Sequence, residues 1–515
     1  MNALPSVSGN RLPRNLANDL VLPTLLFAAL GGMTWAVRGC SGFGALNGCV
    51  FAGVTWGAAW WFIAREPCGL QTRRYASGWI ILALTVGIGL SGARGWMQWP
   101  SFFNGHLQTD TPAGKWEPIP RIYGFIWLFI AGMPWAGIGA CLLAWCGSRR
   151  PTSACQWALR LGCGFGASYL ALFLFNHFPE YFLPLYKSLK AQYLDFQSNP
   201  NLRRLTNDNR AAIRHMGFYL GFLLFEVGRR DWKNVKLILT VGVVNGLGWA
   251  ACQNWQWAAR VWPDGHFNFW RCWESSGGIS IGIAYGLAYY LVNRRMSNEE
   301  IARQGRGLAN GKINLEWLIV YILLLLAFGL FFVPALRGRW GILYFCLGGA
   351  FGIAYYLLNR GKAEEASGDA PLLREDPNLE RLGAYLGLLL GLGMSVRNGL
   401  KGWFNIYVGN ERHWDRVLWQ IAAPLLLLGL LAILVRLLWR PLPRDFRGDT
   451  FPHASKLIWV VLIVQNVIAQ LITGPHSSWL ETAFSIYYVL LFLVSAVIVY
   501  HFHWLKRAKP EPEMA

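Results

Sequence analysis

Long apolar runs separated by short polar turns recur along the whole chain. A helix that crosses a membrane needs about 20 mainly apolar residues, and on that basis the sequence contains about fourteen candidate spans. The pattern predicts an all-α, polytopic integral membrane protein built from repeated helical hairpins, with both termini in the cytoplasm. The spans are Leu20–Val37, Gly42–Ala64, Gly78–Gly92, Ile122–Cys146, Trp157–Phe175, Ala212–Val227, Val235–Ala251, Gly277–Val292, Leu315–Val333, Trp340–Leu358, Leu382–Val396, Val417–Leu438, Leu457–Thr473 and Ala483–Phe502.

Basic residues support this orientation, because cytoplasmic loops carry an excess of Lys and Arg. With the N-terminus inside, more of these residues fall in inner segments than in outer ones. The segment Pro179–Arg214 is an exception, since it is basic and the alternation of spans places it outside. Its first half has apolar residues at helical spacing, and we expect a helix that lies in the membrane interface.

Composition fits a chain whose main solvent is lipid. Only 14% of the 515 residues are charged and 54% are hydrophobic, whereas soluble domains carry about 25% charged residues. The formal charge of +20 would suit a nucleic-acid partner, but no basic run is longer than two residues, and we expect no nucleic-acid binding. No loop is long enough for an independent domain of roughly 50 residues, so residues 1–515 are interpreted as a single membrane domain of the bacterial cytoplasmic (inner) membrane.

Two stretches indicate an internal repeat. Gly282–Arg294 reads GIAYGLAYYLVNR and Gly348–Arg360 reads GGAFGIAYYLLNR, and a Glu-Glu pair follows each of them. Both stretches belong to even-numbered spans, so the repeat would be parallel rather than inverted. The sequence thus favours hairpin repeats within 20–230 and 235–505.

The outer ends of several odd-numbered spans share a pattern. Gly is followed by Leu or Met, a small residue, Arg or Asn, and then Gly and Trp, as in GMTWAVRG at Gly32–Gly39. Small residues permit close helix packing, and Gly permits a tight turn after the Arg. An Arg at a membrane boundary ordinarily anchors a helix. These Arg residues, however, lie on the side that should contain few of them: Arg38, Arg94, Arg337, Arg339 and Arg397.

We predict that these ends form a vestibule for a polar ligand. The planar guanidinium fork suits carboxylate, sulfate or phosphate, and flat Trp rings beside polar groups suit sugars. The alternative is an aromatic belt with ordinary polar loops. The candidate substrate-binding residues are Arg38, Arg94, Trp96, Asn245, Trp255, Arg337, Arg397, Asn398, Trp403, Glu411 and His413.

These features favour a multi-pass permease for a polar, anionic or carbohydrate-like solute. A second hypothesis is a membrane-embedded transferase acting at the outer face on a lipid-linked, polyprenyl-phosphate sugar-type substrate, with a clustered acid–base set such as His413 with Glu411 or Asp415. A third is a structural or assembly protein. The expected partners are a small polar solute or a lipid-linked sugar, and membrane lipids.

Few ionisable residues fall within the spans, which disfavours a proton relay. We expect Glu226 to pair with Arg229 or Arg230, and Arg160 to extend to the membrane surface. No metal-ligand spacing and no nucleophile motif is present, so no cofactor, metal or catalytic residue is assigned. Cys252 and Cys272 flank one outer loop, where a disulfide remains open.

Overall fold

A computed structural model describes ten continuous segments of the chain: 15–39, 46–67, 73–92, 99–109, 115–147, 154–195, 197–262, 269–296, 450–472 and 479–507. It also describes most of 380–395. The described residues are mostly helical (84%), as the apolar runs predicted. The predicted spans 315–333, 340–358 and 417–438, and the second copy of the proposed repeat, lie outside the described residues.

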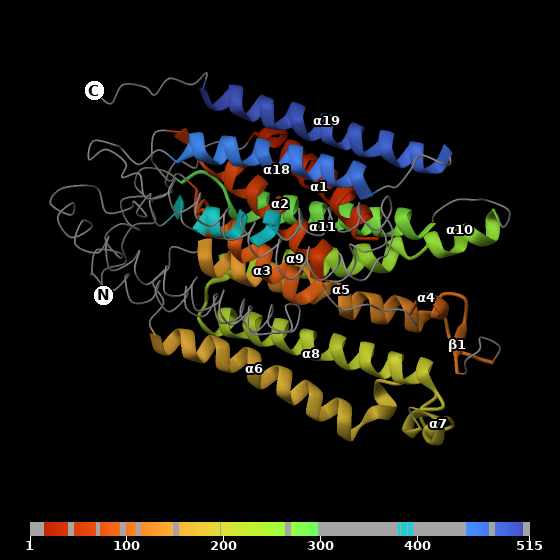
Figure 1. Ribbon diagram of the computed structural model, residues 1–515. Helices are drawn as coiled ribbons and strands as arrows, with labels where there is room; N and C mark the ends of the chain where they lie inside the picture. Colours follow the sequence, from red (N-terminus) through yellow and green to blue (C-terminus); the bar gives the residue numbers. More distant parts are fainter. Residues whose placement is uncertain are drawn as a thin grey trace, which may run out of the picture.

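The described elements are mainly helices whose axes lie roughly along one direction (Figure 1). They are η1 (Ala17–Val21), α1 (Leu22–Arg38), α2 (Leu46–Ala64), α3 (Trp79–Gly92), α4 (Trp99–Phe102), β1 (His106–Gln108), β2 (Trp116–Pro118), α5 (Ile122–Gly147), α6 (Ala154–His177), η3 (Pro179–Tyr181), α7 (Lys190–Leu194), α8 (Pro200–Gly228), α9 (Trp232–Cys252), α10 (Trp255–Val261), α11 (Phe269–Val292), α18 (Phe451–Ile472) and α19 (Trp479–Arg507). The two strands form an antiparallel hairpin.

Six helices in the described part are long and apolar enough to cross a membrane: α1 with η1, α5, α6, α9, α18 and α19. Shorter apolar helices occupy Gly48–Ala64, Trp79–Gly92 and Gly383–Gly393. Helices of this length and composition indicate an α-helical membrane protein. The hairpin repeats and the full set of fourteen spans stay predictions.

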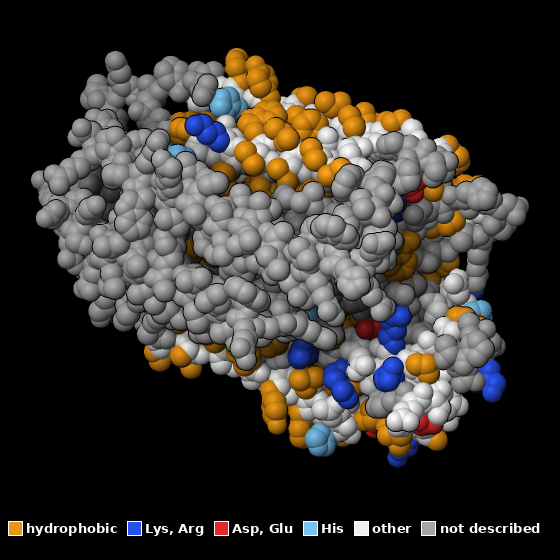
Figure 2. All heavy atoms as spheres, viewed as in Figure 1, with side chains coloured by type: hydrophobic (Ala, Val, Ile, Leu, Met, Phe, Trp, Pro, Cys, Tyr) orange, Lys and Arg blue, Asp and Glu red, His pale blue; other side chains and the backbone are white. Residues whose placement is uncertain are grey.

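The helices form a central group that is flanked on two opposite sides by helices with exposed apolar surfaces. In Figure 1, α6 with α8 and α18 with α19 lie at opposite edges, and α1, α2, α3, α5, α9 and α11 lie between them. Burial agrees, because 78% of the apolar window of α5 is buried, against 22% for α6 and 28% for α19. Hydrophobic side chains cover the α18–α19 edge, and at the opposite edge they are mixed with Lys and Arg (Figure 2). Since water would disfavour such extended apolar surfaces, these edges are the lipid-facing sides.

Glycines bring α1 and α11 into backbone contact. Gly278, Gly282 and Gly286 recur every four residues, on one face of α11. A Cβ at Gly278 would lie 2.0 Å from the carbonyl oxygen of Gly31, and one at Gly282 would lie 2.2 Å from that of Phe27. The two helices therefore pack antiparallel at the closest possible range, as small-residue repeats allow in membranes.

Three helix starts differ from prediction by six residues or more, because the helices continue beyond their apolar runs. α8 begins at Pro200 rather than Ala212, α11 at Phe269 rather than Gly277, and α18 at Phe451 rather than Leu457. The added part of α8 is held by its buried face, where Asn209 accepts a hydrogen bond from Trp99 Nε1 (2.7 Å). The predicted interfacial helix is reduced to α7, since Leu185 adopts a positive φ of 53° that interrupts it.

Candidate functional site

Arg38, the last residue of α1, forms a buried ion pair with Glu274 of α11. Its Nη1 donates to both carboxylate oxygens, at 3.0 and 2.9 Å. Nη2 donates to the carbonyl oxygen of Gly92 (3.1 Å), and Nε donates to the Sγ of Cys49 (3.3 Å). The two charged side chains are only 5% and 2% exposed. Arg38 thus joins the ends of α1, α2, α3 and α11.

Small residues at the helix ends allow the Glu274 carboxylate to come close to Arg38. Gly39 ends α1, and a Cβ there would lie 2.8 Å from Cγ of Glu274. The next residue of α11, Ser275, donates from Oγ to the carbonyl oxygen of Gly32 (2.9 Å). The Gly-rich ends that the sequence showed therefore let a carboxylate reach the guanidinium from the neighbouring helix.

One tryptophan ring lies against Arg38, and further tryptophan rings pack on from it. The guanidinium carbon of Arg38 lies 5.0 Å from the Trp35 ring centroid. Trp35 contacts Trp56 and Trp249 at centroid distances of 5.8 and 6.3 Å, and Trp249 contacts Trp273 at 5.4 Å. A cation over an indole face is attracted by the ring quadrupole. We call Arg38, Glu274, Trp35, Trp249 and Trp273 the Arg38 site.

Several buried polar atoms beside the Arg38 site have no hydrogen-bond partner among the described residues. They include Nε1 of Trp35, Oδ1 of Asn245, and both amide atoms of Gln253. Trp35, Asn245 and Gln253 are each 0% exposed. Asn245, Trp249 and Gln253 follow one another every four residues, so they share one face at the end of α9. Buried polar atoms in native proteins are nearly always bonded, and these atoms can accept or donate to a bound polar molecule.

Three predicted site residues lie in the described part. Arg38 joins Glu274 as above, and Asn245 donates from Nδ2 to the carbonyl oxygen of Gly132 (2.6 Å). Trp255 is half-buried on α10 and donates from Nε1 to the Oγ of Ser276 (2.7 Å). The other predicted residues lie outside the described residues: Arg94, Trp96, Arg337, Arg397, Asn398, Trp403, Glu411 and His413. Convergence of the Arg set therefore stays a prediction.

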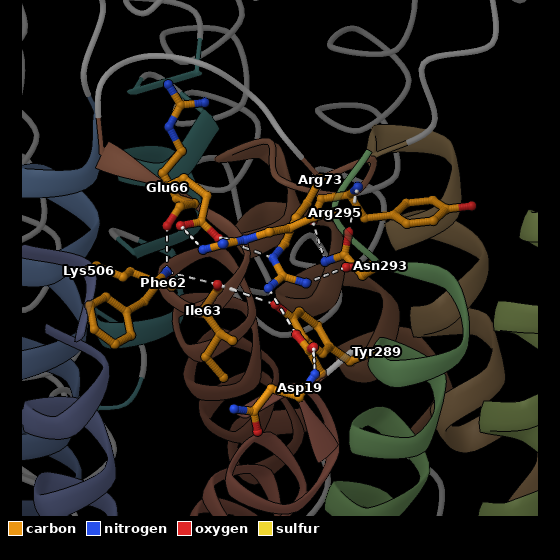
Figure 3. Close-up of polar contacts among 12 residues, drawn as sticks. Asp19, Phe62, Ile63, Glu66, Arg73, Tyr289, Asn293, Arg295 and Lys506 are labelled. Atoms are coloured by element: carbon orange, nitrogen blue, oxygen red, sulfur yellow. Dashed lines mark hydrogen bonds and ion pairs between the residues drawn. The ribbon is translucent and has the colours of Figure 1, made fainter. Parts of the chain in front are cut away.

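A second charged cluster lies at the opposite ends of the same helices (Figure 3). Arg73 donates to the carboxylates of Asp19 (3.0 Å) and Glu66 (3.3 Å), and to the carbonyl oxygen of Asn293 (2.6 Å). Arg295 donates twice to Glu66, at 3.2 and 3.0 Å. The cluster ties the start of the described chain to the segment before α3 and the residues after α11.

Lys506 of the C-terminal helix α19 completes this cluster. We call Asp19, Glu66, Arg73, Arg295 and Lys506 the inner cluster. Its buried Nζ donates to the carbonyl oxygens of Phe62 and Ile63 (2.8 Å each) and of Arg65 (2.5 Å). These carbonyls belong to the end of α2, where a helix leaves its last carbonyls without intrahelical partners and favours a cation. The C-terminal end of α19 is thereby fixed to the centre of the bundle.

Glu66 shows the electrostatic balance of the inner cluster. Burial alone would raise its pKa, but the positive charges of Lys506, Arg73 and Arg295 outweigh burial and hold the pKa below its ordinary value. The carboxylate is therefore ionised at neutral pH and serves as the common acceptor of two arginines. Nothing in this geometry requires a ligand, and we interpret the inner cluster as a structural contact that holds these helix ends together.

The predicted environment of Glu226 and Arg160 was wrong. Glu226 pairs with Arg160 of α6, at 2.7 Å from Nη2, rather than with Arg229 or Arg230, and the two partners are 0% and 1% exposed. Arg160 does not extend to the surface, because its guanidinium lies between the rings of Trp157 (4.4 Å) and Trp145 (4.9 Å). The pair crosses from α6 to α8 and balances both charges inside the protein.

Glu274 was not among the candidate site residues predicted from the sequence, and its pairing with Arg38 was missed. A periodic signal was present, since Glu274 precedes Gly278 by four residues on the glycine face of α11. Cys252 and Cys272 are both free thiols. Within the described segments, no group of three His, Cys, Asp or Glu side chains is placed to hold a metal ion.

Comparison of the chain with models of protein families, with curated proteins and with solved structures finds no match.

Proposed function

We propose that the chain is a multi-pass membrane permease for a polar, carbohydrate-like solute, and that the solute binds at the Arg38 site. One observation supports this above the others: a charge-balanced ion pair is buried against the Trp35 ring, near the Trp35 N–H and the amide atoms of Asn245 and Gln253 that have no hydrogen-bond partner among the described residues. Ligand sites of this kind combine apolar and aromatic walls with a few placed polar groups.

The balance of charge favours a carbohydrate over an anion. Glu274 contacts the guanidinium of Arg38 through both oxygens, so a sulfate or phosphate would have to displace a carboxylate from a buried position. Breaking a buried pair is strongly unfavourable. A sugar hydroxyl instead donates to one acceptor and accepts from one donor, and its C–H face packs on an indole ring. Of the two solute classes that the sequence left open, we therefore propose the carbohydrate.

Transport requires that the solute reach this site from one side at a time. In the described arrangement the Arg38 site lies at one end of the central helices and the inner cluster lies at the other. We propose that the inner cluster keeps the second end closed while the Arg38 site is occupied from the expected outer side. Release would then need the ion pairs around Glu66 to separate.

A binding screen on the full chain tests this proposal. The purified protein in detergent is titrated with glucose, galactose, maltose and sucrose, and with sulfate and glucuronate, while Trp fluorescence is recorded. We expect at least one sugar to bind and to be taken up into proteoliposomes, and Glu274→Gln to weaken its binding by about tenfold or more, since hydrogen bonds to charged groups are worth about 1.5–3 kcal/mol.

Trp35→Phe provides a finer test, because it keeps a ring and removes one N–H. Trp504→Phe is its matched control, since Trp504 is 59% exposed on α19, far along the chain from the site. Weaker sugar binding in Trp35→Phe alone supports the proposal. Saturable uptake of the anions only, or sugar uptake that is equal in wild type, Glu274→Gln and Trp35→Phe, would remove the Arg38 site as the solute site.

A further inference from the structure

A row of arginines follows the exposed side of the N-terminal half of α8. Arg203, Arg204 and Arg210 are exposed and Arg214 is half-buried. Figure 2 shows Lys and Arg side chains gathered along α8. Asp208 is the single acid on this stretch of helix, so the four arginines and one aspartate leave a formal charge of 4 − 1 = +3. We call these four arginines the α8 stripe.

The stripe lies beside the last turns of a lipid-facing helix. α8 packs antiparallel on α6, because a Cβ at Gly217 would lie 2.6 Å from Cα of Ser168. Further along the pair, the guanidinium carbon of Arg210 lies 5.6 Å from the ring centroid of Phe175. The candidate membrane span of α6 ends at His177. Arg210 is thus at the edge of the predicted hydrocarbon layer, and Arg214, one turn further, is about 6 Å deeper.

Lipid can approach this position. The neighbouring face of α6 exposes Tyr169 (75%) and Leu170 (56%), and the connection beyond it exposes Tyr181 (80%). Tyr is typical of the membrane–water interface, where lipid phosphates also lie. At the start of α8 the surface is hollowed into a pocket lined by Pro200, Asn201, Arg203, Arg204, Asn207 and Asp208.

We infer that the α8 stripe binds the phosphate of an anionic membrane lipid. Cations at membrane depth are expensive and are retained where they meet a partner or serve a function. A guanidinium offers a phosphate two parallel hydrogen bonds, and a row of guanidiniums at the headgroup level attracts anionic lipid. The stripe lies on the side that the sequence predicts to be outer, where charges that merely hold loops in the cytoplasm have no place.

The test uses the full chain in nanodiscs of phosphatidylcholine with increasing phosphatidylglycerol, and native mass spectrometry counts the bound phosphatidylglycerol. The variant is Arg203→Gln/Arg210→Gln. Its control is Lys115→Gln/Arg121→Gln, which removes the same charge from exposed positions near the β hairpin and the start of α5. At about 1 kcal/mol per basic residue near the surface, roughly fivefold each, we expect phosphatidylglycerol to bind about thirtyfold more weakly to the stripe variant and unchanged to the control.

Three outcomes separate the alternatives. Equal phosphatidylglycerol binding in wild type, stripe variant and control overturns the inference. Displacement of the lipid by millimolar inorganic phosphate would show a site for free phosphate, which also overturns it. If the stripe variant does not fold, Arg203→Lys/Arg210→Lys replaces it. That variant keeps the charge and should retain most of the binding, and loss of the lipid from wild type at high salt then supports the ionic contact.

Discussion

Removing the carboxylate of Glu274 should destabilise the folded chain far more than removing both members of its ion pair. In Glu274→Ala, Arg38 keeps its bonds to Gly92 and Cys49 but loses both carboxylate oxygens. The guanidinium stays in place, because its side chain is 5% exposed and packs against the Trp35 ring. The variant therefore contains a buried cation with no anion beside it.

The expected magnitude follows from this burial. Breaking a buried pair by removing one partner costs about 3–5 kcal/mol, roughly a fifth or more of a typical total stability of about 5–15 kcal/mol. Replacing both partners by apolar residues of similar volume is often neutral or stabilising. Arg38→Met/Glu274→Leu should therefore be less destabilised than Glu274→Ala or Glu274→Leu, and the double-mutant cycle through Arg38→Met and Glu274→Leu should give a coupling energy of several kcal/mol.

The assay is reversible unfolding by stepwise addition of SDS to the protein in mixed micelles, followed by circular dichroism. Glu180→Ala is the control, because Glu180 is exposed and such substitutions usually change stability by less than about 0.5 kcal/mol. A cost below about 1 kcal/mol for Glu274→Ala, with an additive double variant, is what a solvated surface pair would give. That result would refute the burial on which the Arg38 site depends.

Two further predictions concern packing and pH. Gly278→Ala should cost at least about 3 kcal/mol or prevent folding, because its Cβ would lie 2.0 Å from the carbonyl oxygen of Gly31; Gly166→Ala, with no atom within 4 Å of the added Cβ, is the tolerated control, and equal yields of folded protein would contradict the prediction. The stability that Glu66 contributes should be complete above its ordinary pKa of 4.5 and should be lost as pH falls through its lowered folded-state pKa. Unfolding midpoints measured from pH 6 to pH 3 should therefore fall less in Glu66→Gln than in wild type, and identical slopes would argue against the lowered pKa.

The positions of the helices could be predicted because each apolar run must be long enough for a membrane. α1, α2, α3, α5 and α9 begin and end within a few residues of their predicted bounds. The starts of α8 and α11 could not be predicted from the apolar runs, because polar residues extend these helices through contacts with distant parts of the chain. Asn209 of α8, for example, holds Trp99, which is 110 residues away.

The charged partners were not predictable, because opposite charges at large sequence separation leave no local pattern. Arg38 and Glu274 are 236 residues apart, and Lys506 reaches carbonyl oxygens more than 440 residues earlier. Local reasoning therefore paired Glu226 with the adjacent Arg229 and Arg230, whereas the packing of α6 on α8 brings Arg160 to it. What the sequence did show was where Arg and Gly occur together at helix ends.

The two charged clusters and the glycine contacts together indicate where the bundle opens. α1 and α11 touch through their backbones at Gly31 and Gly278, and the Arg38–Glu274 pair fixes one end of the same two helices. Arg73 fixes the other end, since it bonds both Asp19 of η1 and the carbonyl oxygen of Asn293 after α11. Motion between α1 and α11 would break ion pairs and backbone packing at once.

The contact of α1 with α2 and α3 is of a different kind. It includes the stacked rings of Trp35 and Trp56, and the hydrogen bonds that Arg38 donates to two neutral acceptors, the Sγ of Cys49 and the carbonyl oxygen of Gly92. A solute hydroxyl can take the place of those neutral acceptors while Glu274 keeps the charge balanced, so binding would loosen this boundary and leave the α1–α11 pair intact. We therefore expect a covalent cross-link between α1 and α11 to leave sugar uptake unchanged, and one between α1 and α2 to stop it. The reverse result would mean that α1 and α11 separate during transport, and that the ion pair between them is broken in each cycle.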